Sequence, residues 1–335
     1  MEPFILFGIL FALLLAGVPI AISLGLSASV FMVFLTTTTS MTIAQKLFVS
    51  LNKFALMAIP LFVLMGSFMA QGGTAHRIIR FARALVGHLP GGLPMSAIFA
   101  CVIFAAVSGS SPATVAAIGS IMIGAIQQDG YSERFSVGSI VSSGSLGILM
   151  PPSIILIVYG VTVDQSIGAL FMAGIVPAAF LGLMLMAVTY VAAVKGGHKR
   201  KPMAPLSEIW ASFKDAIWGL MVIIIVIGGI YGGLFTPTEA AAVAAVYAFI
   251  TAKFIYGDLR WKDIPQTINT AAATAAMIMF IIANAMVFAH VLTTQQMPQD
   301  LANFIVALDL NKYTFLILIN LMLLLAGNFM EPSSL

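Results

Sequence analysis

The stretch SGSSPAT, at residues 108–114, interrupts an otherwise apolar region of this sequence, and the polar stretch GNFMEPSS does the same at residues 327–334. The prolines of the two stretches, Pro112 and Pro332, are 220 residues apart. Lipid cannot hydrogen-bond the backbone groups that glycine and proline leave free, so such breaks persist in a membrane only against protein or a water-filled cavity. Matched breaks in two halves of one chain are typical of a transporter's binding site.

The composition excludes an ordinary soluble domain. Of the 335 residues, 61% are apolar and 8% are charged, with a mean hydropathy of +1.08. In soluble proteins about a quarter of the residues are charged. Long continuous apolar runs favour helices over a β-barrel, whose strands alternate apolar and polar residues. The sequence therefore predicts an all-α polytopic protein in a lipid bilayer, and nothing in it supports binding to nucleic acid.

Apolar windows close to the length that a helix needs to cross a bilayer recur along the chain. They cover residues 4–35, 54–70, 135–159, 167–194, 216–235, 238–254, 271–292 and 313 onward. The first window is too long for one span and contains Gly17-Val18-Pro19, which predicts two helices that meet at this break. The paired Pro151 and Pro152 predict a broken helix over about 135–160, because proline removes a backbone donor and clashes with the preceding turn.

The two halves of the chain share landmarks at nearly one offset. Pro19 falls on Pro237 at an offset of 218, and residues 54–66 fall on 274–286 at the offset of 220 that the tip prolines also share. Chance alignment of prolines is the alternative, but three landmarks within two residues of one offset favour an internal duplication. The expected division is 1–201 for the first repeat and 202–335 for the second, incomplete repeat.

Basic residues form three clusters, which should all be cytoplasmic because short cytoplasmic loops are enriched in Lys and Arg. The clusters are His76, Arg77, Arg80 and Arg83; Lys195, Lys199, Arg200 and Lys201; and Lys253, Arg260 and Lys262. Two full spans lie between the first two clusters, so residues 93–126 must enter the membrane and return as a re-entrant hairpin. The segment leading to Gly327 then enters from the opposite face. The sequence predicts an inverted repeat with two opposed hairpins.

The first tip combines hydroxyl groups with backbone carbonyls that the break releases. These are hard, uncharged oxygen donors, and Pro112 preorganises a helix start whose N–H groups face the tip, so a cation or an anion can be bound. The alternative is that Ser111 only caps the helix that begins at Pro112. The unwound backbone before Pro151 and Pro152 would expose further carbonyls beside the tip, with a passive proline kink as the alternative.

The other polar residues of the apolar segments are expected to have simpler roles. Residues 236–239 form a capping box that ends in Glu239, with proline at the first helical position. Asn284 and His290 are expected to make interhelical hydrogen bonds. Glu331 lies in the second tip and needs a cation or a donor as partner, because burying a lone carboxylate costs about 3 kcal/mol. No nucleotide-binding, metalloprotease or nucleophile-elbow motif occurs, so we do not expect an enzyme.

Several motifs together resemble one known family over essentially the whole chain. They are SGSSPAT at 108–114, the run from Gly130-Tyr131-Ser132 through Gly144-Ser145-Leu146-Gly147 to Pro151-Pro152-Ser153, and the segments 170–177, 235–242 and 327–332. They resemble the large membrane subunit of tripartite ATP-independent periplasmic (TRAP) transporters. The resemblance implies a sodium-coupled secondary transporter of the bacterial inner membrane that imports an organic acid, such as a C4-dicarboxylate or sialic acid. It also implies an elevator-type fold of the ion-transporter superfamily, a small four-helix membrane subunit and a periplasmic substrate-binding protein as partners.

The resemblance also implies site residues, carried over by position. The first Na⁺ site would comprise Ser108, Gly109, Ser110, Ser111, Thr114, Gly144, Ser145 and Gly147. The second would comprise Gly327, Asn328 and Glu331. Ser110, Ser111, Pro151 and Pro152 would contact the substrate, and Na⁺ is the only metal expected, with no transition metal. A hairpin-type carrier that works without a binding protein and, more distantly, an intramembrane enzyme are the alternatives.

The predicted repeat also bears on the length of the chain. The first half continues from Pro112 to Val194, whereas three residues follow Pro332. Symmetry therefore predicts about 80 to 90 further residues, and hence a natural protein of about 420 residues. The 335-residue chain alone is then expected not to transport.

Cysteine substitutions test the predicted sidedness, because the chain has a single native cysteine. Cysteines introduced by Arg80→Cys or Lys199→Cys are expected to react only with reagent that reaches the cytoplasm. A cysteine introduced by Gln296→Cys is expected to react from outside. Thiol labelling of intact cells and of inverted vesicles measures this. Labelling of positions 199 and 296 from the same side would contradict the inverted repeat.

Overall fold

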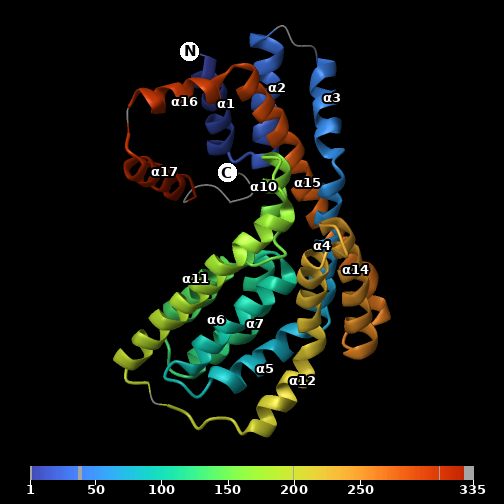
Figure 1. Ribbon diagram of the computed structural model, residues 1–335, viewed down its shortest axis with the longest axis vertical. Helices are drawn as coiled ribbons and strands as arrows, with labels where there is room; N and C mark the ends of the chain where they lie inside the picture. The colour runs from blue at the N-terminus through green and yellow to red at the C-terminus, as the bar shows by residue number, and fades with distance from the viewer. Residues whose placement is uncertain (1, 37–39, 199, 309, 328–335) are drawn as a thin grey trace. The chain divides into compact units, whose positions relative to one another are not determined.

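The computed structural model describes residues 2–36, 40–198, 200–308 and 310–327. This part of the chain is helical and contains no strand, so the all-α prediction is confirmed (Figure 1). The chain forms two compact units: unit 1 comprises Met1–Lys53 and Ala276–Leu335, and unit 2 comprises Phe54–Ala275. Each unit contains residues of both predicted repeats, and the division into repeats stays a prediction.

The helices are distributed between the units as follows. Unit 1 contains α1 (Glu2–Leu15), α2 (Ile20–Leu35), α3 (Ser40–Leu51), α16 (Met297–Ala307) and α17 (Lys312–Gly327). Unit 2 contains η1 (Phe54–Met57), α4 (Ala58–Gln71), α5 (Thr74–Val86), α6 (Gly92–Ser108), α7 (Ser111–Gln128), α8 (Glu133–Gly144), α9 (Leu146–Leu149), α10 (Ile154–Thr162), α11 (Ile167–Lys195), α12 (Leu206–Ile223), α13 (Gly229–Tyr231) and α14 (Pro237–Ile250). The remaining long helix, α15 (Ile264–Thr294), begins in unit 2 and ends in unit 1.

Several of these helices have the length and composition of membrane spans. Within the described residues, five candidates are Phe54–Gln71, Ile167–Lys195, Leu206–Tyr231, Pro237–Ile255 and Trp261–Thr294. A sixth is the pair Glu133–Leu149 and Ile154–Thr162, which is bent by 41° at its break. Single turns of π-helix, at Ile224–Gly228 and Thr251–Ile255, extend α12 and α14. The windows read from the sequence therefore correspond to real helices.

Four helices differ from the sequence prediction. α12 begins at Leu206 and α15 at Ile264, earlier than the apolar windows indicated, because polar residues in their first turns lower the local hydropathy. α3 and α16 were not predicted at all. Both are short, at 12 and 11 residues, and both mix polar with apolar residues, so neither gives a spanning-length apolar signal.

The predicted break between the first two helices is confirmed. Gly17 follows α1 with a φ of 79°, a left-handed conformation that glycine adopts without strain. The Val18 N–H donates to the Leu13 carbonyl and the Gly17 N–H to the Leu14 carbonyl, each at 3.0 Å. These two bonds are the Schellman pattern that satisfies the last carbonyls of a helix. Pro19, which has no N–H, then precedes α2.

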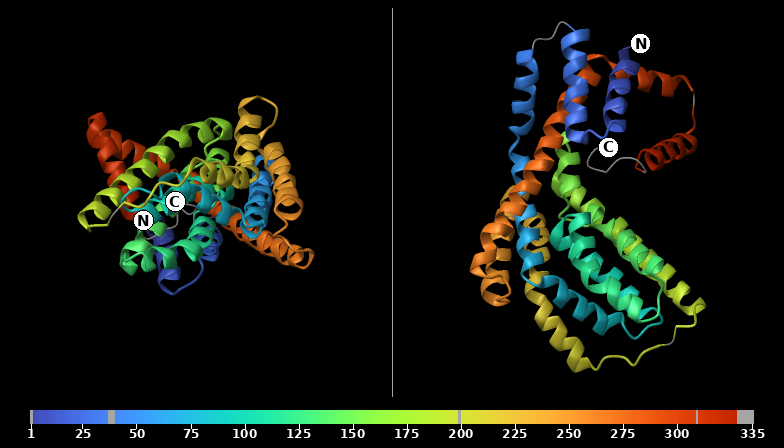
Figure 2. Two further views of the ribbon diagram at one scale, coloured as in Figure 1. Left: turned by 90° about the horizontal axis from the view of Figure 1, so that it is seen from below. Right: turned by 180° about the vertical axis from the view of Figure 1, so that it is seen from behind.

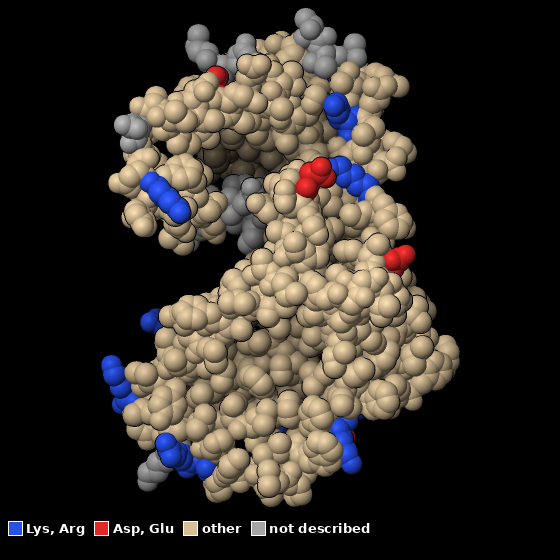
Figure 3. Space-filling view, viewed as in Figure 1, with Lys and Arg blue, Asp and Glu red and all other residues tan. Residues whose placement is uncertain are grey.

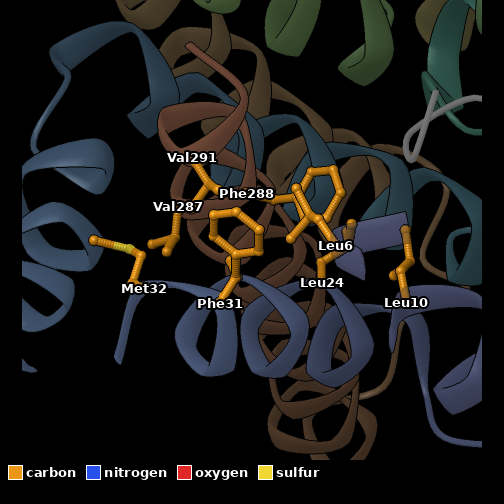
Figure 4. Close-up of a cluster of buried hydrophobic side chains, with 9 residues drawn as sticks. Leu6, Leu10, Leu24, Phe31, Met32, Val287, Phe288 and Val291 are labelled. Atoms are coloured by element: carbon orange, nitrogen blue, oxygen red, sulfur yellow. The ribbon is translucent and has the colours of Figure 1, made fainter. Parts of the chain in front are cut away.

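Unit 1 has a hydrophobic core between α1, α2 and the second half of α15 (Figure 4). Its buried side chains are Leu6, Leu10, Leu24, Ala28, Phe31, Met32, Val287, Phe288 and Val291. The Phe7 and Phe288 rings meet edge-on, with centroids 5.8 Å apart. This core joins the beginning of the chain to a helix more than 250 residues later in the sequence.

Unit 2 is built around the pair α6 and α7, which lie side by side and antiparallel (Figures 1 and 2). α8 packs against both of these helices, and α11 packs along α6. α5 contacts α6 and α12, while α4 packs closely against α14 and also touches α6. Helices from widely separated parts of the sequence therefore surround α6, whereas one face of α7 is exposed.

The helix order of the second half follows that of the first. α6 begins at Gly92 and α17 at Lys312, which are 220 residues apart, the same offset as the tip prolines. In each half a short helix, α5 or α16, comes directly before. This order agrees with the predicted duplication, whereas the inverted arrangement of the halves stays a prediction.

Residues of the predicted basic clusters meet at one end of unit 2. Arg77 pairs with Asp258 at 2.6 Å, with its guanidinium 3.9 Å from the centre of the Tyr256 ring. Arg80 pairs with Asp215 at 2.6 Å, and the Tyr256 hydroxyl donates to the Asp215 carbonyl at 2.9 Å. Burial raises the pKa of Tyr256 to about 12, so its hydroxyl stays protonated. Figure 3 shows Lys and Arg along the lower margin of unit 2.

Asn284 of α15 lies against α2 within unit 1. Its Nδ2 donates to the Phe280 carbonyl of its own helix at 2.8 Å, so the predicted interhelical hydrogen bond of Asn284 is wrong. The contact between the helices is a packing contact instead, because the carboxamide occupies the space in which a Cβ at Gly25 would lie. Asn284 is buried, which limits how far its side chain can move.

Gly25→Ala is therefore expected to destabilise the protein by about 1 to 3 kcal/mol, because the added methyl group overpacks the contact. Thermal unfolding in detergent measures the change. Gly8→Ala is the matched control, since a Cβ at Gly8 meets nothing within 4 Å. The double variant Gly25→Ala/Asn284→Ala should recover most of the loss. Equal unfolding midpoints for the Gly25 and Gly8 variants would show that the contact is not tight.

Candidate functional site

The hairpin tip lies between the end of α6 and the start of α7. α6 ends at Ser108, and Gly109 follows with a φ of 61°. α7 begins at Ser111, with Pro112 in its first turn, where an N–H is not needed. Residues of the predicted hairpin over 93–126 form a pair of antiparallel helices (Figure 2). Its re-entrant path through a membrane stays a prediction.

Polar groups of the tip bond to one another. Ser108 Oγ lies 2.8 Å from Thr114 Oγ1, and both residues are buried. Thr114 Oγ1 donates to the Ser110 carbonyl at 2.9 Å. A buried polar group without a partner costs about 1 to 3 kcal/mol, so this network stabilises the break. It also gathers three oxygen atoms within a few ångströms.

The helix that follows the hairpin is broken, as predicted for residues 135–160. α8 ends at a junction with the one-turn helix α9, and α10 begins only after Pro151 and Pro152. Both prolines are buried. Ser153 then caps α10, because its side chain accepts a hydrogen bond from the Leu156 N–H at 3.5 Å. The break is therefore an unwound segment between two helix ends and not a kink within one continuous helix.

The hairpin tip and the broken helix are joined by hydrogen bonds. Ser111 Oγ donates to the Gly144 carbonyl at 2.7 Å. In the other direction, the Ile154 N–H donates to the Gly109 carbonyl at 3.4 Å. Ser111 lies in the first turn of α7, and the N-cap residue is Ser110, whose side chain makes no capping bond. The alternative in which Ser111 only caps the helix is therefore wrong.

Gly147 allows the two segments to approach at backbone distance. A Cβ at this position would lie 2.7 Å from the Ser111 nitrogen and 2.8 Å from the Ser110 carbonyl carbon. A Cβ at Gly109 would lie 2.6 Å from the Pro152 carbonyl oxygen. Both glycines are buried. The predicted tip residues therefore lie directly against Gly144 and Gly147 of the broken helix.

α4 forms a further wall of this site, which the sequence reasoning missed. A Cβ at Gly66 of α4 would lie 2.9 Å from the Ser108 carbonyl oxygen, so the helix backbone packs directly against the tip. Ser153 was also not among the predicted site residues. The available signal was a glycine inside an apolar helix, which often marks the close approach of another backbone.

One further predicted residue of the broken helix makes no side-chain bond to the tip. Ser145 is exposed, and its Oγ donates to the Ser142 carbonyl at 2.7 Å. Gly327 ends α17 in unit 1. Asn328 and Glu331 lie outside the described residues. Ser145 therefore contributes no side-chain bond to the tip, and the structure does not test the second site.

The oxygens collected at the tip suit a hard cation of low charge. They come from Ser108 Oγ, Ser111 Oγ, Thr114 Oγ1 and the carbonyls of Ser110 and Gly144, all of which are uncharged. The Ser111 hydroxyl donates to the Gly144 carbonyl and keeps its own lone pairs, whereas the Ser110 carbonyl already accepts from the Thr114 N–H, Thr114 Oγ1 and Ser108 Oγ. No group of three or more His, Cys, Asp or Glu side chains suited to a metal ion occurs within the described residues.

The residue Glu239, in contrast, has a structural role, as predicted. Its Oε2 accepts from the Thr236 N–H at 2.8 Å, and the Glu239 N–H donates to Thr236 Oγ1 at 3.3 Å. These reciprocal bonds form the capping box at the start of α14.

Comparison with known proteins identifies the family. Residues 7–335 match the model of the tripartite ATP-independent periplasmic transporter, DctM component. The chain belongs to this family. It is a multi-pass membrane protein, the large permease of a TRAP transporter and not an enzyme, which confirms the resemblance seen in the sequence.

This chain covers most of the length of several relatives whose names state a substrate. The chain is 47% identical to the C4-dicarboxylate TRAP transporter large permease protein DctM of Rhodobacter capsulatus, over 100% of this chain and 79% of the relative. It is 49% identical to the protein of the same name from Pseudomonas aeruginosa, over 93% and 73%. It is 37% identical to the sialic acid TRAP transporter large permease protein SiaM of Vibrio cholerae, over 96% and 76%.

Gly147→Ala is expected to lower the transport rate of this TRAP permease by about tenfold or more, because the new Cβ displaces the backbone of the tip. Uptake by the reconstituted transporter, corrected for protein abundance, measures the change. Gly138→Ala in α8 is the matched control, since a Cβ there meets nothing within 4 Å. Equal loss of uptake in the two variants would show that the transport rate does not depend on the close approach at Gly147.

Proposed function

We propose that this chain is the ion- and substrate-conducting subunit of a sodium-coupled importer of an organic acid in the bacterial inner membrane. Its partners are a small four-helix TRAP membrane subunit and a periplasmic substrate-binding protein. The observation that carries the proposal is the hydrogen bond from Ser111 to the Gly144 carbonyl, which joins the hairpin tip to the unwound helix. Discontinuous helices that meet in this way form the ion and substrate sites of many secondary transporters.

The proposed sodium site is the group of tip oxygens. Na⁺ is a hard ion that prefers oxygen ligands, and one positive charge does not require a carboxylate to balance it. The end of α6 adds the negative end of a helix dipole, which favours a cation. Ser108, Ser110, Ser111, Thr114 and Gly144 are the proposed ligands. Gly109 and Gly147 give the backbone room to approach, and Ser145 contributes through its main chain.

The proposed contact with the substrate lies at the start of α7. The N-terminus of this helix, at Ser110 and Ser111, carries the positive end of a dipole, which favours a carboxylate, although the Ser110 N–H already donates to Ser108 Oγ at 3.4 Å. Both side chains are half-buried. Pro151 and Pro152, which are buried beside the tip, are the proposed apolar neighbours of the substrate. An anion and Na⁺ held in adjacent positions stabilise each other, which couples the two binding events.

A C4-dicarboxylate is the proposed substrate class. The two relatives from Rhodobacter capsulatus and Pseudomonas aeruginosa, at 47% and 49% identity, are both named for C4-dicarboxylates, whereas the sialic acid permease is 37% identical. Gly327, Asn328 and Glu331 are proposed to form a second sodium site, because α17 occupies the position in the second half that α6 occupies in the first. The proposed movement is an elevator-type displacement of the part of the protein that contains the hairpin and the broken helix.

The function is tested with the complete natural transporter in proteoliposomes. Uptake of labelled succinate is expected to require an inward sodium gradient and the binding protein, and to proceed without ATP. Replacing sodium with choline should abolish it. Uptake that persists in choline would contradict sodium coupling, and uptake without the binding protein would favour the hairpin-type carrier. Preference for sialic acid over succinate would contradict the substrate class alone.

Ser111→Ala tests the proposed site itself. The sodium concentration for half-maximal uptake is expected to rise about tenfold, because the variant loses one oxygen and its bond to the Gly144 carbonyl. Ser120→Ala is the matched control on the same helix, since Ser120 is exposed and bonds only to the Ala117 carbonyl of its own turn. If both variants kept the wild-type sodium dependence, Ser111 would not be a ligand.

A further inference from the structure

A cavity of about 620 Å³ opens in unit 2 between α5, the start of α6, α7 and the segment before α12. Arg80, Arg83, Lys201, His76 and His88 line it. His76, Arg80 and Arg83 are spaced by four and three residues on α5, so they lie on one face of that helix. The cavity is therefore surrounded by N–H donors, and the transport chemistry proposed above does not use it.

Two of the three cationic side chains of this lining form ion pairs with carboxylates. Arg80 pairs with Asp215, and Lys201 pairs with Asp129. Arg83 is exposed and forms no ion pair with any other residue that the structure describes. Glu208 also lines the cavity and is its acidic member. The guanidinium of Arg83 thus retains its planar set of donors for an external anion.

The rest of the lining is apolar. Leu93, Ile121 and Met203 contribute side chains to the wall, together with two prolines of the segment before α12. Met203 is 61% exposed, although a methionine side chain is strongly apolar. A small, fully hydrated ion would make no favourable contact with these apolar side chains. They fit a ligand that carries hydrocarbon next to its charge.

The position of the cavity agrees with such a ligand. The candidate span Phe54–Gln71 ends just before α5, Ile167–Lys195 ends just before the lining segment, and Leu206–Tyr231 begins just after it. Three span ends are therefore joined by short segments of chain to elements that line this cavity. Basic pockets at the ends of spans lie at the level of phospholipid headgroups, and on the cytoplasmic side those headgroups are often anionic.

We propose that this cavity binds a phosphate group, with Arg83 as its principal donor and His76 and His88 as further donors. The phosphate belongs to an anionic phospholipid headgroup or to free phosphate. The apolar wall and the three span ends favour the lipid. Arginine forms two parallel hydrogen bonds to phosphate, which explains why this residue rather than a paired lysine is the main contact.

The test uses the purified transporter complex. Binding of short-chain phosphatidylglycerol, of phosphatidylcholine with matched chains and of inorganic phosphate is followed by native mass spectrometry and by the thermal unfolding midpoint. Arg83→Gln removes the guanidinium. Lys262→Gln is the matched control, because it removes an equal charge from an exposed residue outside the lining. Arg83→Lys keeps the positive charge but removes the planar guanidinium that can form two parallel hydrogen bonds.

Phosphatidylglycerol is expected to bind the wild type and Lys262→Gln equally, and to bind Arg83→Gln about tenfold more weakly. Arg83→Lys should fall between them, and phosphatidylcholine should not compete. Displacement of phosphatidylglycerol by millimolar phosphate would assign the site to phosphate in general, and no displacement would assign it to the lipid.

Equal affinity of Arg83→Gln and Lys262→Gln for phosphatidylglycerol would overturn the proposal, and so would equal binding of the two lipids. If Arg83→Gln did not fold, Met203→Glu would replace it, because this change adds a negative charge to the lining and leaves the arginine in place. It should weaken phosphatidylglycerol binding by a similar factor. Unchanged affinity in that variant would also overturn the site.

Discussion

Two breaks in the backbone, one at the hairpin tip and one in the helix that follows it, satisfy each other's hydrogen bonds. Ser111 donates to the Gly144 carbonyl, and the Ile154 N–H donates to the Gly109 carbonyl. Lipid offers no replacement for either bond, so neither break would persist alone in a membrane. The packing of the surrounding helices, from α4 to α11, holds the two breaks in this contact.

Close approach of backbones is the second requirement of this arrangement. Gly147 faces the backbone of the tip, and Gly66 faces the Ser108 carbonyl from α4. Any side chain at these positions would push the segments apart and lengthen the hydrogen bonds. The same closeness gathers uncharged oxygens into a small volume. In the proposed sodium site, uncharged ligands of this kind would allow the ion to be released, which a transporter requires in every cycle.

The charged end of unit 2 obeys a different constraint. The side chains are partly exposed there, so arginines can pair with aspartates without a large desolvation cost. The pairs of Arg77 with Asp258 and Arg80 with Asp215 tie α5 to α12 and to the loop after α14. Arg83, on the same helix, has no such partner within the described residues. The paired arginines make structural contacts, whereas the unpaired Arg83 is able to bind an anion.

The sequence by itself determined the helical class, the break at Gly17–Pro19, the hairpin and the broken helix. Glycine and proline act on their own backbone, so their effects can be read locally. The family motifs and the polar tip also identified most of the candidate site. Only the tertiary structure decided that Ser111 bonds to Gly144, that Gly66 adjoins the tip and that Asn284 packs on Gly25. Each of these contacts joins segments at least 33 residues apart, and the packing of several helices, not any local pattern, selects the partner.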